Sequence, residues 1–179
     1  MGIFDIGKAK DKGSVEEVTN TAIEKGGVLA ILYFDAHGNT PEEVEGLLVN
    51  LGQTVAQEKG VIYALSEIDR ALQMEDKYFS SGAKVRILAD SFKSLVGLCG
   101  RYGPMGIEVL KPNEIVLKTG DVHEILFHIS EMSHDYTTNM MMKLMKPEER
   151  VAFSEKMRHR AEMGKKLMDE TEKEQNEKK

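Results

Sequence analysis

The chain has 179 residues, of which 41% are hydrophobic and 30% charged, and its formal net charge at pH 7 is −6. This length and composition predict one main folded domain with a sizeable core. The acidic balance argues against a dedicated nucleic-acid surface, because phosphate backbones select basic surfaces. No apolar run approaches the roughly 20 residues of a membrane-spanning helix, and the first residues, MGIFDIGKAKDKG, lack the apolar stretch of a secretory signal.

Cys99 is the single cysteine, so the chain cannot form an internal disulfide. A lone thiol is typical of a reducing compartment, and we expect a cytoplasmic protein. Cys99 falls on the apolar side of its predicted helix. That position indicates a buried, unreactive thiol rather than a nucleophile.

The N-terminal third of the chain predicts a short helix and a central strand. The first dozen residues have no periodic pattern, and we expect them to be loosely held. Ser14 followed by Glu17 is a capping-box pattern, which predicts the start of the helix. The continuous apolar run VLAILYF, residues 28–34, predicts the strand, and DAHGN, residues 35–39, predicts the turn after it.

An amphipathic helix is predicted over 41–58. Thr40 can cap it, and Pro41 suits its first position. Its apolar residues recur at helical spacing: Val44, Leu47, Leu48, Leu51 and Val55. VIYALSEI, residues 61–68, predicts a second strand, and residues 69–82 predict a long hairpin connection.

The next segment alternates between apolar and charged residues. AKVRILA, residues 83–89, therefore predicts a half-exposed strand. A helix follows from Asp90 or Ser91, and its two glycines, Gly97 and Gly100, suggest close packing against a sheet. Two short strands are then predicted, or one strand broken at a Pro-Asn turn: 106–110 and 114–118.

The predicted order is strand, helix, strand, strand, helix, strand. This is the split βαβ pattern of ferredoxin-like domains, an α+β fold. Right-handed crossovers would place both helices on one face of a four-stranded antiparallel sheet. Over residues 27–118 the chain thus resembles the ferredoxin-like superfamily. The absence of cluster-binding cysteines means that the resemblance implies no iron–sulfur centre, and we expect no cofactor.

A second resemblance is carried by RYGPMGIEVLKP, residues 101–112, together with the acidic helix after it. This combination is similar to an uncharacterised family of small archaeal proteins, and the similarity brings no known activity with it. The domain organisation that we expect has four parts: a segment with a short helix at 1–26, the ferredoxin-like domain at 27–118, a C-terminal helical extension at 119–170 and a charged tail at 171–179.

A long helix is predicted over 122–145, where apolar residues recur on one side: Val122, Ile125, Leu126, Ile129, Met132, Tyr136, Met140 and Leu144. We expect this side to dock on the domain. The opposite side carries Glu124, His128 and Glu131, which are ligand types that zinc accepts. One helix face seldom supplies a full ligand shell, and no HExxH motif is present, so we expect this side to face water without a metal.

A second, semi-apolar stripe on the same helix predicts an interaction surface. Its members cluster near one direction: His123, Phe127, His134, Met141 and Met145. Such a stripe typically meets another helix. Two partners are open at this point, namely the chain's own last helix, predicted over 148–170, and a second subunit.

One candidate ligand site lies at the end of the first strand. Asp35, His37 and Asn39 could line a small pocket there, and an Asp–His pair is the minimum for general-base chemistry. The ordinary alternative is that these polar groups cap a turn. The glycine-rich GRYGPMG follows a helix and precedes a strand, whereas a phosphate-binding loop has the opposite order. No catalytic residue is therefore assigned.

These patterns favour a non-enzymatic module that self-associates or binds a protein partner through its C-terminal helices. Two alternatives remain. One is a small-molecule sensor resembling ACT-type regulatory domains, with FDAHGN, residues 34–39, as the ligand loop. The other is a metal-dependent enzyme that uses Asp35 and His37, or His128 with its acidic neighbours.

Overall fold

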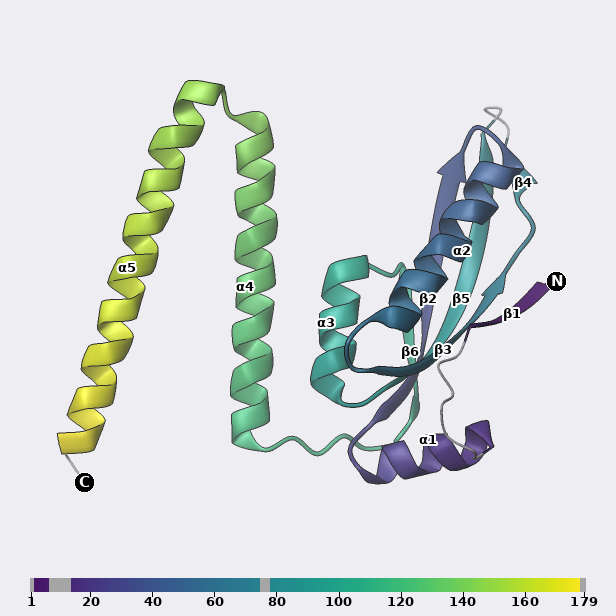
Figure 1. The fold of residues 1–179 in the computed structure, drawn as a ribbon, viewed down its shortest axis with the longest axis horizontal. Helices are drawn as coiled ribbons and strands as arrows, with labels where there is room; N and C mark the ends of the chain where they lie inside the picture. Colours follow the sequence, from purple (N-terminus) through teal and green to yellow (C-terminus); the bar gives the residue numbers. More distant parts are fainter. Residues whose placement is uncertain (1, 7–13, 75–77, 178–179) are drawn as a thin grey trace. The chain divides into compact units, whose positions relative to one another are not determined.

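A computed structural model of the chain describes residues 2–6, 14–74 and 78–177. This part of the chain is α+β, with five helices and six strands (Figure 1). In chain order the elements are β1 (Gly2–Ile6), α1 (Val15–Glu24), β2 (Val28–Gly38), α2 (Pro41–Gln57), β3 (Val61–Ile68), β4 (Leu72–Gln73), β5 (Phe79–Ala89), α3 (Phe92–Tyr102), β6 (Gly106–Lys111), α4 (Thr119–Leu144) and α5 (Pro147–Glu177).

The chain is divided into two compact units, Met1–Met132 and Ser133–Lys179, and the boundary between them falls inside α4. The first unit contains the sheet, α1 to α3 and the first half of α4. The second contains the rest of α4 and α5. None of the described helices has an apolar stretch sufficient to cross a membrane.

The strands form one antiparallel sheet in the order β1-β3-β5-β2-β6, and β4 pairs with the beginning of β5. Its centre is the pair β2 and β5, which stay in register from Val28 opposite Ala89 to Gly38 opposite Phe79. β2 begins with the apolar run VLAILYF, and such a run is typical of a strand in the middle of a sheet. The two long strands therefore form the frame on which the other elements pack.

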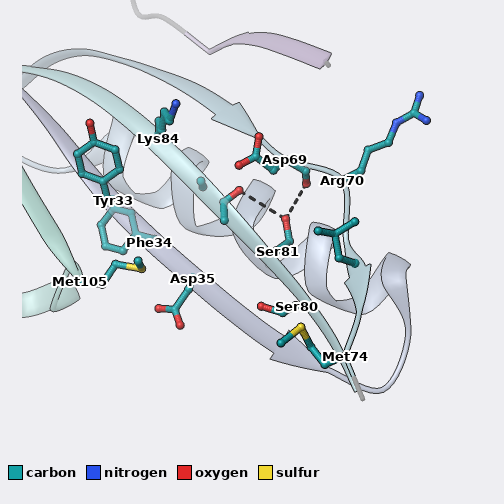
Figure 2. Close-up of a pocket in the computed structure, with 13 residues that line it drawn as sticks. Tyr33, Phe34, Asp35, Asp69, Arg70, Met74, Ser80, Ser81, Lys84 and Met105 are labelled. Carbon is teal, nitrogen blue, oxygen red and sulfur yellow. Dashed lines mark hydrogen bonds between the residues drawn. The ribbon is translucent and has the colours of Figure 1, made fainter. Parts of the chain in front are cut away.

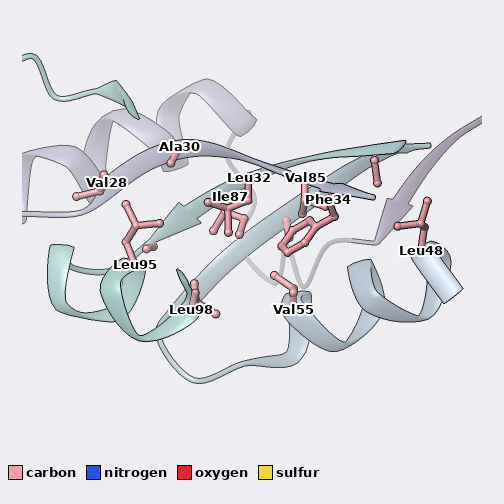
Figure 3. Close-up of a cluster of buried hydrophobic side chains, with 13 residues drawn as sticks. Val28, Ala30, Leu32, Phe34, Leu48, Val55, Val85, Ile87, Leu95 and Leu98 are labelled. Carbon is pink, nitrogen blue, oxygen red and sulfur yellow. The ribbon is translucent and has the colours of Figure 1, made fainter. Parts of the chain in front are cut away.

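The main core lies between the sheet and the helices α2 and α3 (Figure 3). Its buried members come from β2, β3, β5, α2 and α3: Val28, Ala30, Leu32, Phe34, Leu48, Val55, Ala64, Ala83, Val85, Ile87, Ala89, Leu95 and Leu98. The β2 and β5 members alternate along each strand, so they all point to one face. Both helices consequently cover that same face of the sheet.

α1 packs on the opposite face of the sheet, at one end. Ala22 of α1 joins Leu29, Tyr63 and Leu88 in a second buried cluster. The hydroxyl groups of Thr19 and Tyr63 share a hydrogen bond of 2.9 Å, which satisfies two polar groups in this contact. The short length of α1 leaves the rest of this face uncovered by any described helix. We call this remainder the open sheet face.

A polar contact ties the end of α2 to the end of α3. Glu58, the residue after α2, accepts a 2.5 Å hydrogen bond from the Tyr102 hydroxyl. It also accepts bonds of 2.8 and 2.7 Å from Nη1 of Arg101. The hydrogen bonds from Tyr102 and then from Arg101 hold the pKa of Glu58 below its ordinary value of 4.5. The contact fixes α3 at its C-terminal end.

The structure confirms an α+β chain with a short first helix and a helical extension. Ser14 and Thr40 cap α1 and α2 as predicted, each accepting from the backbone N–H three residues later. Several boundaries differ from the predictions. β1 lies in the N-terminal segment that was expected to be loosely held, and α5 continues to Glu177, into the predicted charged tail.

Two further predictions of local structure are wrong. Residues 35–38 continue β2 and are not a turn, because their backbone pairs with the start of β5 at Ser80 and Ser81. Few apolar residues lie in this part of β2, so the sequence shows no strand pattern there. Residues 114–118 form no strand. Instead, this segment leads from β6 to α4, and Ile115 packs against the core.

Replacing Gly52 by Ala should separate α2 from β3. Gly52 is buried, and a Cβ atom there would collide with Oγ of Ser66 on β3. We expect a loss of about 1–3 kcal/mol in the free energy of unfolding, measured by urea denaturation. Gly46→Ala in the same helix is the matched control, because its Cβ would meet nothing within 4 Å. The control should gain up to about 1 kcal/mol from helix propensity, and equal effects of the two variants would contradict the close contact.

The contact at Glu58 should make stability depend on acidic pH. Because the pKa of Glu58 is lower in the folded state, the ionised carboxylate stabilises the folded protein at pH values above 4.5, the ordinary pKa. This stabilisation is lost as the pH falls through the folded-state pKa. Glu58→Gln should therefore destabilise the protein at pH 7, and its deficit should shrink below pH 4.5. Thermal melting at several pH values measures this. The exposed control Glu155→Gln should show no such pH trend.

Candidate functional site

Two surfaces stand out, and the first is built on the outer side of α3. The inner side of α3 buries Leu95 and Leu98 in the core. On its outer side a Cβ atom at Gly97 would lie 3.3 Å from Nε2 of His128. A Cβ atom at Gly100 would collide with the end of the Met132 side chain. The two glycines therefore leave room on α3 for the side chains of His128 and Met132, and we call them the glycine pad.

The docked side of α4 is narrow and partly polar. Ile125 is the buried residue of the described α4 side chains. Lys93 of α3 forms an ion pair with Glu124, but both side chains are at least half exposed, so the pair contributes little stability. The contact thus depends mainly on Ile125 and on the two side chains that cover the glycine pad.

The predicted orientation of α4 is confirmed only in part: Ile125, on the side expected to dock, is buried, and Met132 from the same side covers Gly100. His128 was expected to face water, yet its side chain lies over Gly97 and is 33% exposed. Conversely, the side that was expected to dock is mostly open, since Leu126 is 62% exposed and Tyr136 is 69% exposed. The reason is the shape of the glycine pad. It accommodates the flat imidazole ring of His128 and the flexible thioether of Met132, and apolar periodicity along α4 does not reveal such a contact. The two glycines consequently pack against α4 rather than against a sheet.

Charge is segregated around α4. At about 100° per residue, its charged side chains fall within roughly 120° of arc: Asp121, Glu124, Glu131, Asp135 and Lys143. The opposite half of the helix has no Asp, Glu, Lys or Arg. We call it the uncharged half of α4. It includes the second apolar stripe and most of the first, whereas Ile125 and Met132 of the first stripe lie within the charged arc. Its large exposed side chains are Val122, Leu126, Phe127, Ile129, Tyr136, Met140, Met141 and Leu144.

The predicted interaction surface lies within this uncharged half or directly after it. His123, Phe127, His134 and Met141 are exposed, and Met145 is half-buried just beyond the end of α4. In α5, none of the side chains that the structure describes is buried. Phe153 and Met157 are its half-buried apolar residues.

The histidine and acidic residues of α4 are divided among different partners. Glu124 pairs with Lys93, while Nδ1 of His128 lies 4.0 Å from Oε2 of Glu131. Within the described ranges, no three His, Cys, Asp or Glu residues are grouped as a metal would require. Cys99 is half-buried against the core, and burial raises the pKa of its thiol, which disfavours the reactive thiolate.

The second surface is a hollow of about 380 Å³ on the open sheet face (Figure 2). Strands β2 and β5 and the connection after β3 form its walls. Among the residues that line it are Tyr33, Asp35, Asp69, Lys84 and Met105. The hydrogen bond that the Tyr33 hydroxyl donates to Glu108 raises the pKa of Tyr33. Tyr33 therefore keeps its proton and forms an uncharged wall.

Of the three residues predicted to bind a ligand, Asp35 and His37 lie together and Asn39 lies apart. Asp35 and His37 project from β2, and Nε2 of His37 is 3.0 Å from Oδ2 of Asp35. Asp35 lines the hollow. The backbone N–H of Asn39 donates a 3.0 Å hydrogen bond to Glu43, so Asn39 belongs to the start of α2. Sequence reasoning missed Asp69 and Gly82, which only strand pairing brings beside Asp35.

A comparison with known families places these surfaces in context. Residues 29–176 match the MJ0538 family. The chain belongs to the MJ0538 family. The MJ0538 match starts at β2 and runs through both C-terminal helices, so α4 and α5 are part of what defines the family. No curated protein matches the chain, and no solved structure matches it.

Gly100→Ala tests the glycine pad. The new methyl group would collide with the flexible end of the Met132 side chain, which must move away, so we expect a weaker contact between α3 and α4. Amide hydrogen exchange over 121–132 should accelerate, while exchange in β2 and β5 should stay as slow as in the wild type. The double variant Gly100→Ala, Met132→Ala removes the collision and should restore most of the protection. Acceleration of the same size in the double variant would contradict the contact.

Proposed function

We propose that the chain is a non-enzymatic module that self-associates through the uncharged half of α4. The observation that carries this proposal is the exposure of large apolar side chains along a helix whose charges are all gathered on the other side. A helix exposed to water on all remaining sides would carry charges there. Contiguous exposed apolar surface is typical of a protein interface.

The spacing of the exposed residues fits helix-to-helix packing. Six positions of α4 follow each other at alternating steps of four and three: Val122, Leu126, Ile129, Ser133, Tyr136 and Met140. This is the spacing of a coiled-coil seam. The uncharged half is wider than such a seam, which favours burial by more than one helix, as in a four-helix bundle.

A second copy of the chain is the partner that we propose. In a two-fold dimer the same patch meets itself, so a charge near the two-fold axis would face its own copy, and a charge elsewhere on an apolar patch would be buried without a partner. The uncharged half of α4 meets this condition because it has no permanent charge to repel its own copy. The family match supports the proposal, since it includes α4 and α5 and not only the sheet.

The body that carries the interface is, we infer, a ferredoxin-like domain over residues 27–118, followed by the helical extension at 119–170. Support comes from the strand order β3-β5-β2-β6 and from α2 and α3, which cover one face of the sheet. The location that we propose is the cytoplasm, and the lone cysteine supports it.

Sedimentation equilibrium over a concentration series tests self-association. Leu126→Glu and Ile129→Glu each place a carboxylate in the uncharged half, so we expect the dissociation constant to rise roughly 100-fold or more. Gln53→Glu adds the same group to an exposed position of α2 and should leave association unchanged. Circular dichroism should show native helix content in all three variants. A wild-type chain that stays monomeric at high micromolar concentration would contradict the proposal.

A further inference from the structure

The hollow on the open sheet face has a floor without side chains. Gly82 of β5 lies opposite Asp35 of β2, and its backbone C=O accepts a 2.9 Å hydrogen bond from the Asp69 N–H. A Cβ atom at Gly82 would lie 3.6 Å from Oδ2 of Asp69, so the Asp69 carboxylate is on this face. Strands are about 4.8 Å apart, so the two aspartates flank Gly82 with about 10 Å between their backbones.

A cation lies close to these two carboxylates. Lys84 is two residues from Gly82 on β5 and points to the same face, at about 7 Å along the strand. In the described part of the chain, neither Lys84 nor the carboxylate of Asp69 forms an ion pair. Asp35 is paired only with His37, at 3.0 Å. The hollow therefore contains both carboxylates and an ammonium group, and these groups can still bind a ligand of opposite charge.

The position of the Asp69 side chain is fixed by its own backbone. The hydroxyl of Ser81, which is buried, donates a 2.6 Å hydrogen bond to the Asp69 carbonyl oxygen. Figure 2 shows Asp35 on one side of β5 and Asp69 on the other, whereas Arg70 extends away from the hollow. The carboxylates are thus set on two sides of the bare floor, and Arg70 does not fill the space.

Apolar side chains surround the charged centre. Met105, Leu72 and Met74 line the hollow, and each is more than half exposed, with Met105 at 70%. Methionine side chains adapt to apolar groups of different shapes. The ring of Tyr33 adds a further wall, held in place because Gly106 leaves room for it. An apolar group in the hollow would cover these surfaces.

We propose that this hollow binds a small amphipathic zwitterion of the class of apolar α-amino acids. The ligand ammonium lies over Gly82 between Asp35 and Asp69, and its carboxylate meets the flexible side chain of Lys84. The apolar side chain of the ligand packs against Met105, whose backbone N–H donates a hydrogen bond to the Tyr33 carbonyl oxygen at the level of Lys84. This site is separate from α4, so it stands or falls independently of self-association.

Titration calorimetry and methyl NMR of the full chain test the proposal, with L-leucine as the probe. We expect saturable binding and a shift of the Met105 methyl signal. 4-Methylpentanoate lacks the ammonium group and 3-methylbutylamine lacks the carboxylate. Each should bind roughly tenfold more weakly or worse, because each leaves charged groups of the hollow without a partner. Equal binding of all three compounds, or no shift at Met105, would overturn the proposal.

Gly82→Ala gives a steric test that spares the fold. Its methyl group would meet Asp69 at an ordinary contact distance of 3.6 Å, so the chain should fold and melt as the wild type does. The same methyl group fills the floor, and L-leucine binding should be lost. Asp69→Asn should weaken binding roughly tenfold, while the exposed control Asp135→Asn should not. Full affinity in Gly82→Ala would contradict the site, and unchanged sedimentation of Gly82→Ala keeps this result distinct from self-association.

Discussion

The docking of α4 on α3 depends on two residues of α3 that have no side chain, Gly97 and Gly100. α3 is packed on both sides, with leucines toward the core and Gly97 and Gly100 toward α4. Because Gly97 and Gly100 have no Cβ atoms, the side chains of His128 and Met132 can lie directly on the α3 backbone. The polar tie at Glu58 holds the end of α3, and α3 in turn positions the first half of α4. The uncharged half of α4 is left open because a narrow contact suffices to dock the helix.

The elements with a strong period could be predicted from the sequence. Apolar periodicity identified α2, α4 and the second half of β5, because burial on one face imposes a period of 3.6 or 2. Apolar runs identified β3 and the first part of β2. The short strands β1 and β4 could not be found this way, since β4 has two residues and its pairing uses backbone groups. Pairing through the backbone alone leaves little trace in the side chains.

The candidate sites show a different limit of sequence reasoning. An apolar stripe reveals that a helix side is suited to burial, but it does not say which element covers it. The whole stripe was therefore expected to dock, although Ile125 and Met132 are its docked members, and the glycines on α3 were the available signal for the contact. Likewise, Asp35 was recognised along the chain, whereas Asp69 and Lys84 join it only through strand pairing across β5.

The ends of the sheet have a consequence for growth into fibrils. The outer strands in the described part of the chain are β1 and β6, and β1 has only five residues, Gly2–Ile6. β6 spans only Gly106–Lys111, and Pro112, which has no N–H to donate, follows it directly. A short strand that ends at a lysine and a proline makes a poor template for another chain. The molecule can thus expose apolar helical surface while its β-sheet resists end-to-end polymerisation.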